Sequence, residues 1–258
     1  MKIAAFNVNS IRARLPVLLD WLDKSRPDIL AVQETKAQDV DFPAVAFDKI
    51  GYKYAFKGQK SYNGVAVLSK SELKNVHFGL DDDPKDMPRL IMANISRINI
   101  INTYIPQGFE PESEKFQYKL KWFERLRKFF ENHCTPDKPV LWLGDFNVAP
   151  LPIDVYDPKA LIGHVCFNKD VKKALENVMQ WGFVDIFRKH CKEPEQYTFW
   201  DYRIRAALKR NRGWRLDHIM ATKSLAEKST ACYIDIQPRL AQRPSDHTPI
   251  IAEFDWQL

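Results

Sequence analysis

The chain has 258 residues, of which 45% are hydrophobic and 28% are charged, an ordinary composition for a soluble globular protein. Lysine and arginine outnumber aspartate and glutamate by 39 to 33, a mild excess that suits a polyanionic partner without requiring one. No apolar stretch approaches the roughly 20 residues of a membrane-spanning helix, and the apolar run before Asn7 is too short for a signal peptide. The cysteines are far apart and form no C-x-x-C pair, which disfavours a zinc site. We therefore expect a cytoplasmic protein with free thiols and no membrane contact.

Short apolar runs predict the strands of the fold. Most of these runs are continuous rather than alternating, as expected of strands that are covered on both faces. In chain order they span residues 2–7, 28–33, 64–69, 89–95, 98–105, 139–145, 215–221 and 249–255.

Helical patterns fall between these runs. Pro16 is expected in the first turn of one helix, Ser113 caps a second and Asn168 caps a third. No linker or composition break divides the chain, so we predict one α/β domain over residues 1–258, with helices covering its sheets. The apolar faces are Leu18, Leu19 and Leu22; Phe116, Leu120, Phe123 and Phe130; and Val171, Leu175 and Val178.

Polar side chains stand at the ends of six predicted strands, where open α/β sheets gather ligand sites. Asp145 and Asn147 close one strand, and in an extended chain such residues point to the same side, although ordinary turn formation would also explain them. Asp217 lies within a strand pattern, where a buried carboxylate needs a cation or a donor nearby. The full set is Asn7, Asn9, Gln33, Glu34, Tyr104, Asp145, Asn147, Asp217, Asp246 and His247.

Six motifs in one order resemble those of the exonuclease III family of apurinic/apyrimidinic (AP) endonucleases, in register from Lys2 to Glu253. The resemblance implies a DNase I-like, four-layer α/β/β/α sandwich of two packed mixed sheets flanked by helices. It also implies Mg²⁺-dependent cleavage of DNA phosphodiesters, with Mn²⁺ expected to substitute. The motifs are FNVNSIRAR, QETK, NTYIPQG, GDFNVAP, GWRLDH and PSDHTPI.

The resemblance also implies a set of metal ligands. Glu34 matches the principal ligand of the family, and Asp246 resembles its companion near the same ion. Asn7 and Asn9 fit as neutral oxygens that orient ligands or waters, although some relatives have Asp in place of Asn9. Mg²⁺ prefers such oxygen ligands. The implied metal set is Asn7, Asn9, Glu34, Asp145, Asn147 and Asp246.

The catalytic roles follow from the same resemblance. Asp145 resembles the residue that activates the attacking water, and Asn147 would bind the phosphate or hold Asp145. His247 would bind a non-bridging oxygen when protonated, with Asp217 as its orienting partner. Tyr104 would hydrogen-bond the phosphate, and Asn7 completes the catalytic set.

The segment 197–218 mixes aromatic and basic residues, which suits a nucleic-acid surface. A solvated loop or helix face with a few core aromatics is the alternative. The resemblance assigns Phe199, Trp214 and Leu216 to a pocket for a flipped abasic sugar, from which an intact base is excluded by size. Arg203, Arg205 and Gln107 would complete the substrate-binding set, although some relatives have an apolar wedge in place of Arg203.

The predicted function is cleavage of double-stranded DNA 5′ to abasic sites by a monomer, giving a 3′-hydroxyl and a 5′-deoxyribose phosphate. The family also implies 3′→5′ exonuclease and 3′-phosphodiesterase activity. One alternative is a non-catalytic nucleic-acid-binding regulator of the same fold, which would have no need of the complete ligand set. Another is a phosphoesterase acting on lipids or inositol phosphates, which the basic 197–218 segment disfavours.

Overall fold

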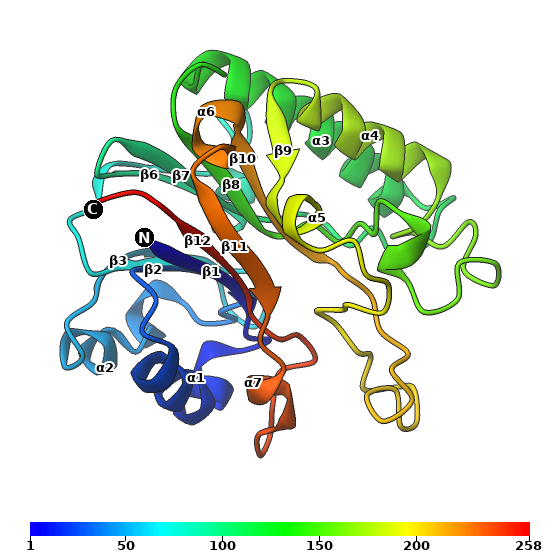
Figure 1. Ribbon diagram of the computed structural model, residues 1–258, viewed down its shortest axis with the longest axis horizontal. Helices are drawn as coiled ribbons and strands as arrows, with labels where there is room; N and C mark the ends of the chain where they lie inside the picture. The colour runs from blue at the N-terminus through cyan, green and yellow to red at the C-terminus, as the bar shows by residue number, and fades with distance from the viewer.

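Two mixed β-sheets pack face to face in the computed structural model, and helices cover their outer faces (Figure 1). The structure describes residues 1–258, apart from the side chains of Pro84 and Lys85. Within this described part, the strand orders are β11-β12-β1-β2-β4-β3 and β5-β6-β7-β8-β10-β9. The strands are β1 (Lys2–Asn7), β2 (Ile29–Gln33), β3 (Lys53–Lys57), β4 (Val65–Ser69), β5 (Lys74–Phe78), β6 (Leu90–Ile95), β7 (Ile98–Tyr104), β8 (Val140–Asp145), β9 (Phe183–Asp185), β10 (Asp217–Thr222), β11 (Ser229–Ile234) and β12 (Ile250–Phe254).

The helices form the two outer layers, with α1 and α2 against the first sheet and α3 and α4 against the second (Figure 1). Ser113 and Asn168 cap α3 and α4 as predicted, since each side chain accepts backbone N–H groups of the first turn. The helices are α1 (Ile11–Ser25), α2 (Ala44–Asp48), α3 (Glu114–His133), α4 (Lys169–Met179), α5 (Ile186–His190), α6 (Lys223–Ala226) and α7 (Gln237–Leu240).

The expectation that Pro16 opens the first helix is wrong. The helix begins at Ile11, and Pro16 lies inside it. The N–H groups of Ser10 and Ile11 donate to the carbonyls of Glu34 and Thr35, at 2.8 and 3.0 Å. The loop after β2 therefore fixes where α1 begins, and this loop is distant in sequence.

Three hydrophobic clusters fill the three interfaces between the four layers. Along β1, Ile3 and Ala5 face the second sheet, whereas Ala4 and Phe6 face α1. Both faces of the central strands are thus covered, which explains why their sequences are continuous apolar runs. The predicted four-layer sandwich is confirmed. Among the described residues, no helix is long and apolar enough to cross a bilayer.

The four described strands that the apolar pattern did not predict are β3, β5, β9 and β11, and they are the edges of the two sheets. Edge strands are short and carry polar side chains, because one side of each is unpaired. The strand predicted from residue 215 begins instead at Asp217. The carboxylate therefore starts β10 and does not interrupt it.

Parallel pairing brings the polar strand ends together. β1 runs parallel to β2 with Asn7 opposite Gln33, and β7 runs parallel to β8 with Tyr104 opposite Asp145. β10 runs antiparallel to β8, which places Asp217 opposite Asp145. The tripeptide Phe-Asn-Val occurs at residues 6–8, at the end of β1, and at 146–148, directly after β8. β1 and β8 each have one parallel and one antiparallel neighbour.

Candidate active site

The amide of Asn7 joins the polar strand ends of the two sheets. Its Nδ2 donates to Glu34 Oε1 at 2.8 Å and to Asp145 Oδ2 at 2.9 Å. Asn7 and Asp145 are buried, and Glu34 follows β2 directly. Gln33, by contrast, points between the sheets and donates to Asn102 at 2.7 Å. The site therefore begins where the first sheet meets the second.

Asp145 and Asn147 converge as predicted, but not through an extended chain. Asn147 has a φ of 51°, so the backbone turns at this residue. Its N–H donates to Asp145 Oδ1 at 2.9 Å, and its Nδ2 donates to Asp145 Oδ2 at 3.2 Å. The turn interpretation is confirmed, and the turn itself aims the carboxamide at the carboxylate, so the functional interpretation stays a prediction that this geometry permits.

Three residues of the site adopt the left-handed backbone conformation: Asn9, Glu34 and Asn147, with φ of 44°, 51° and 51°. Asn tolerates this region, whereas for Glu it costs about 1–2 kcal/mol. Such strain persists where the surroundings enforce it, typically at functional sites. Here the carbonyl of Glu34 accepts the N–H of Ser10, and Thr35 N donates to Gly64 at 3.1 Å.

His247 is held by a carboxylate on each ring nitrogen. Its Nδ1 lies 2.7 Å from Asp217 Oδ2, and its Nε2 lies 3.8 Å from Asp145 Oδ2. Burial lowers the pKa of His247, but the charges of Asp217 and Asp145 outweigh it and raise this pKa to about 10. The ring is therefore an imidazolium at neutral pH and can donate to an anion.

The carboxyl groups of Asp145 and Glu34 have opposite pKa shifts. Burial raises the pKa of Asp145, and the charges of Asp217 and Glu34 add to it while His247 opposes it, so that the pKa lies well above that of an ordinary Asp. Burial also acts to raise the pKa of Glu34, but the charge of Lys36 and hydrogen bonds from Asn7 and Lys36 bring it below its usual value. A carboxylate of lowered pKa thus stands beside one of raised pKa.

The donor set fits a divalent cation. Ligand atoms of Glu34, Asp145 and His247 lie within 4.8 Å of one another. Lys36 Nζ lies 2.7 Å from Glu34 Oε2 and donates to Asn9 Oδ1 at 2.5 Å. Carboxylate oxygens such as those of Glu34 and Asp145 are the ligands that a hard ion such as Mg²⁺ takes.

Two predicted members of the site lie at its border. Asp246 is outside the group of three ligands and accepts a hydrogen bond from Asn9 Nδ2 at 2.9 Å. The hydroxyl of the half-buried Tyr104 interacts with Glu34, and its pKa is raised well above 10 by burial first and then by Glu34 and Asp145. Tyr104 is therefore a neutral hydroxyl.

Sequence reasoning missed three residues that support the site. Lys36 is in the QETK motif, two positions after Glu34, but was given no role. Ser245 Oγ donates to the Asn7 carbonyl at 2.7 Å and accepts the N–H of His247 at 3.2 Å. The fully buried Lys119 donates to the carbonyl of Asn147 at 2.7 Å. Lys119 stands three residues after Phe116, on the apolar face of the predicted helix. A lysine at such a position was the sequence signal that could have identified it as a buried cation.

The predicted DNA-contact residues differ in exposure. Phe199 lies beside His247, with ring centroids 4.8 Å apart. Trp214 and Leu216 are buried in the core that the second sheet shares with α3 and α4. Three further predicted residues, Arg203, Arg205 and Gln107, are exposed, and Arg203 pairs with Asp201.

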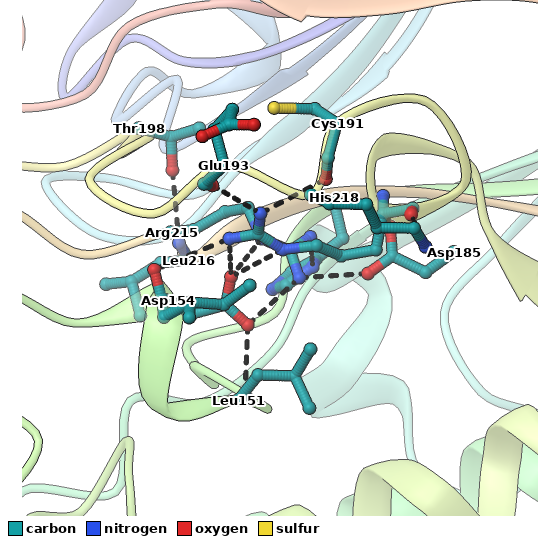
Figure 2. Close-up of polar contacts among 12 residues, drawn as sticks. Leu151, Asp154, Asp185, Cys191, Glu193, Thr198, Arg215, Leu216 and His218 are labelled. Atoms are coloured by element: carbon teal, nitrogen blue, oxygen red, sulfur yellow. Dashed lines mark hydrogen bonds and ion pairs between the residues drawn. The ribbon is translucent and has the colours of Figure 1, made fainter.

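Arg215 is not part of the basic surface, although the sequence reading counted it among the cations of 197–218. It is completely buried and bonds Asp154 Oδ1 at 2.7 Å and Asp185 Oδ2 at 2.9 Å (Figure 2). Its NH1 also contacts His218 Nδ1 at 2.8 Å, and His218 Nε2 donates to the carbonyl of Val148 at 2.8 Å. This buried network joins the start of β10 to the loop that carries Asn147.

The charge of His247 should be visible in stability. A His whose folded pKa rises from about 6.5 to about 10 contributes stability that is complete below pH 6.5 and is lost as the pH rises to 10. In EDTA, the difference in unfolding free energy between the parent and His247→Asn should therefore shrink by at least about 1 kcal/mol from pH 6 to pH 10. Urea unfolding measures this difference in free energy at each pH. If the difference between the parent and the variant did not depend on pH, the ring of His247 would be neutral.

The fold and this site define a family. The sequence profile of the Endonuclease/Exonuclease/phosphatase family matches residues 4–247, and the chain belongs to this family. The chain is 33% identical to exodeoxyribonuclease III of Haemophilus influenzae, with 98% of this chain and 100% of that protein covered. It is also 33% identical to an exodeoxyribonuclease of Bacillus subtilis, covering 97% of this chain and 98% of that protein.

Solved structures agree with the sequence comparison. An AP endonuclease from Archaeoglobus fulgidus superposes with a TM-score of 0.97 at 50% identity, covering 99% of this chain and 100% of that one. A 3′ phosphatase from Neisseria bound to a product DNA hairpin superposes with a TM-score of 0.92 at 38% identity, with 99% and 100% covered. These likenesses make the chain an enzyme of the exodeoxyribonuclease III and AP endonuclease type, that is, a hydrolase.

Proposed function

We propose that the protein is a Mg²⁺-dependent DNA repair endonuclease that cleaves double-stranded DNA 5′ to an abasic site, leaving a 3′-hydroxyl and a 5′-deoxyribose phosphate. The observation that carries the proposal is the pair of hydrogen bonds from Asn7 to Glu34 and Asp145. It sets an oxygen-rich cation site directly beside a carboxylate of raised pKa. The likeness to exodeoxyribonucleases and AP endonucleases supplies the substrate class.

In this proposal Glu34 would hold the ion, with Asn7, Asn9, Asn147 and Asp246 orienting ligands or waters around it and Asp145 next to it. The bound ion supplies positive charge to the phosphate oxygens. Mn²⁺, which also accepts carboxylate and water ligands, is expected to replace Mg²⁺.

The side chains of this chain supply the acid–base chemistry. Asp145 accepts a proton from the attacking water, because its raised pKa makes it a better base than an ordinary Asp. The water oxygen bonds to phosphorus, and the bond to the 3′-oxygen of the upstream nucleotide breaks. The His247 imidazolium donates to the phosphate oxygens as charge develops, and Asp217 keeps His247 charged. Asn147 Nδ2 donates to the Ile105 carbonyl and to Asp145 Oδ2, so Asn147 would hold the Asp145 carboxylate in place.

Lesion recognition would use the aromatic and basic residues of the segment 197–218. Phe199, whose ring lies next to that of His247, would contact the extruded sugar. Trp214 would hold Phe199 in position, since the backbones of these two residues exchange hydrogen bonds of 2.9 Å. Arg203 and Arg205 would bind DNA phosphates, which requires Arg203 to exchange Asp201 for a phosphate.

The same site would remove nucleotides and blocking groups from a 3′ end, because that reaction breaks an equivalent P–O bond. The Neisseria structure, a 3′ phosphatase bound to product DNA, supports this second use of the site. A lipid or inositol phosphoesterase would not need the exposed cations of 197–218.

The proposal is tested with a duplex that contains one synthetic abasic site. We expect a single nick 5′ to the site that disappears in EDTA and returns with excess Mg²⁺. Glu34→Gln should need a higher Mg²⁺ concentration for half-maximal rate, whereas Glu131→Gln, on the exposed face of α3, should behave as the parent. Binding without cleavage by the parent would identify a non-catalytic regulator. Cleavage of inositol phosphates in preference to DNA would identify the other alternative.

A further inference from the structure

A second group of metal-ligating side chains lies at the β5 edge of the second sheet, separated from β8 by β6 and β7. His77 is on β5, Asp81 is in the loop that follows, and His133 is the last residue of α3. His77 Nε2 lies 3.4 Å from Asp81 Oδ1, and His133 Nε2 lies 2.9 Å from the Asp81 carboxylate. All three ligand atoms fall within 4.8 Å of one another.

The two imidazole rings are held in place by one aromatic side chain. Phe129 lies one turn before His133 on α3, and its ring centroid is 4.4 Å from that of His133 and 5.4 Å from that of His77. The two histidine rings are 5.1 Å apart. Such packing reduces the side-chain entropy that binding a ligand would cost.

An ion pair alone does not account for His77. Its Nε2 is buried, and it makes no hydrogen bond with any residue that the structure describes. The 3.4 Å contact with Asp81 is thus close but misaligned. Buried polar atoms without a partner are uncommon in native proteins, and each points to a missing ligand or a functional role.

We propose that His77, Asp81 and His133 form a Zn²⁺ site. Tetrahedral ligands about 2.0–2.1 Å from Zn²⁺ are about 3.3 Å apart, close to the contacts seen here. Imidazole nitrogens favour Zn²⁺ over the hard ions Mg²⁺ and Ca²⁺. Both histidine side chains remain about one-third exposed, so they can close on an ion, and water completes the coordination. The wide cysteine spacing disfavours a thiolate zinc site but has no bearing on these histidines.

The site would fasten an edge strand to a helix. β5 is an edge strand that pairs with a neighbouring strand on one side only, and α3 covers the outer face of the same sheet. An ion bound to His77 and Asp81 on one side and His133 on the other cross-links the two elements. Because the unfolded chain does not assemble these ligands, Zn²⁺ binding stabilises the folded state.

The test measures Zn²⁺ binding to the metal-free protein by calorimetry in excess Mg²⁺, which is present to occupy the catalytic site. We expect one site whose affinity falls at least tenfold in His77→Asn and in His133→Asn. It should persist in Asp145→Asn, which changes only the catalytic cluster. His190→Asn is the matched control, because His190 ends α5 as His133 ends α3.

Thermal unfolding provides a second readout that does not depend on calorimetry. Zn²⁺ at about one hundred times its dissociation constant should raise the midpoint of the parent by at least about 5 °C, but not that of His77→Asn. Both histidine variants should keep the far-ultraviolet circular dichroism of the parent. Equal Zn²⁺ affinity in all variants, loss of binding only in Asp145→Asn, or no binding by a folded parent would each overturn the proposal.

Discussion

Asp145→Asn should lower the rate of abasic-site cleavage by about 10²–10⁴-fold, the usual contribution of a positioned general base. The substitution keeps the size of the side chain but removes the group that accepts the proton of the water. Asp145 is buried, and burial and the neighbouring carboxylates raise its pKa, which suits it to this role. Lys36 and Asn7 lower the pKa of Glu34, which makes Glu34 a weaker base than Asp145.

The structural cost of this variant must be measured separately. Asp145 accepts hydrogen bonds from Asn7, Asn147 Nδ2 and the Asn147 N–H, and an amide at this position leaves one donor facing another. We expect a loss of about 1–3 kcal/mol of unfolding free energy, with the protein still folded.

Single-turnover cleavage with enzyme in excess separates chemistry from binding. The variant should bind abasic DNA about as tightly as the parent and form the cleaved product far more slowly than the parent does. Asp137→Asn, which changes an exposed carboxylate in a turn after α3, is the control for a generic Asp substitution. A cleavage rate within threefold of the parent would assign the base to another group.

The second large effect concerns stability. Asp154→Ala should lower the unfolding free energy by about 3–5 kcal/mol, because it removes the shared partner of two buried arginines. Asp154 is completely buried and bonds Arg215 at 2.7 Å (Figure 2). It also bonds Arg188 at 2.6 Å. Arg215 would keep Asp185, but Arg188 would keep only backbone carbonyls.

The pKa of Asp154 gives the pH range in which this stabilisation exists. Burial acts to raise this pKa, but the charges and hydrogen bonds of Arg215 and Arg188 lower it to about 2. A lowered carboxyl pKa contributes stability above the unfolded value of about 3.9, which is lost as the pH falls to 2. The cost of Asp154→Ala should therefore be complete at neutral pH.

Differential scanning calorimetry should show the melting midpoint lowered by roughly 6–20 °C. The matched control is Asp201→Ala, which breaks the exposed pair with Arg203 and should cost less than about 1 kcal/mol. Similar shifts in the two variants would show that burial of the Asp154 network has no energetic consequence. We also expect slower cleavage by Asp154→Ala, since Arg215 and His218 connect the network to the start of β10 and to Val148.

The sequence by itself determined the central strands, the caps of α3 and α4 and the identity of the polar residues at the strand ends. These features are local: a strand covered on both faces must be apolar throughout, and an N-cap needs a side-chain acceptor at one position. The order of the six motifs also indicated the family to which the chain belongs. The Asn7, Glu34, Asp145, Asp217 and His247 cluster was therefore predictable as a set.

Only the tertiary structure decided how these residues act on one another. Edge strands β3, β5, β9 and β11 lack a continuous apolar run because pairing with a distant neighbour creates them. The start of α1, the charge of His247 and the burial of Arg215 likewise depend on groups far away in the chain, namely the loop after β2, Asp217 and Asp154. Electrostatic interactions act through space and depend on burial, so the sequence could name the charged groups but not their protonation or their partners.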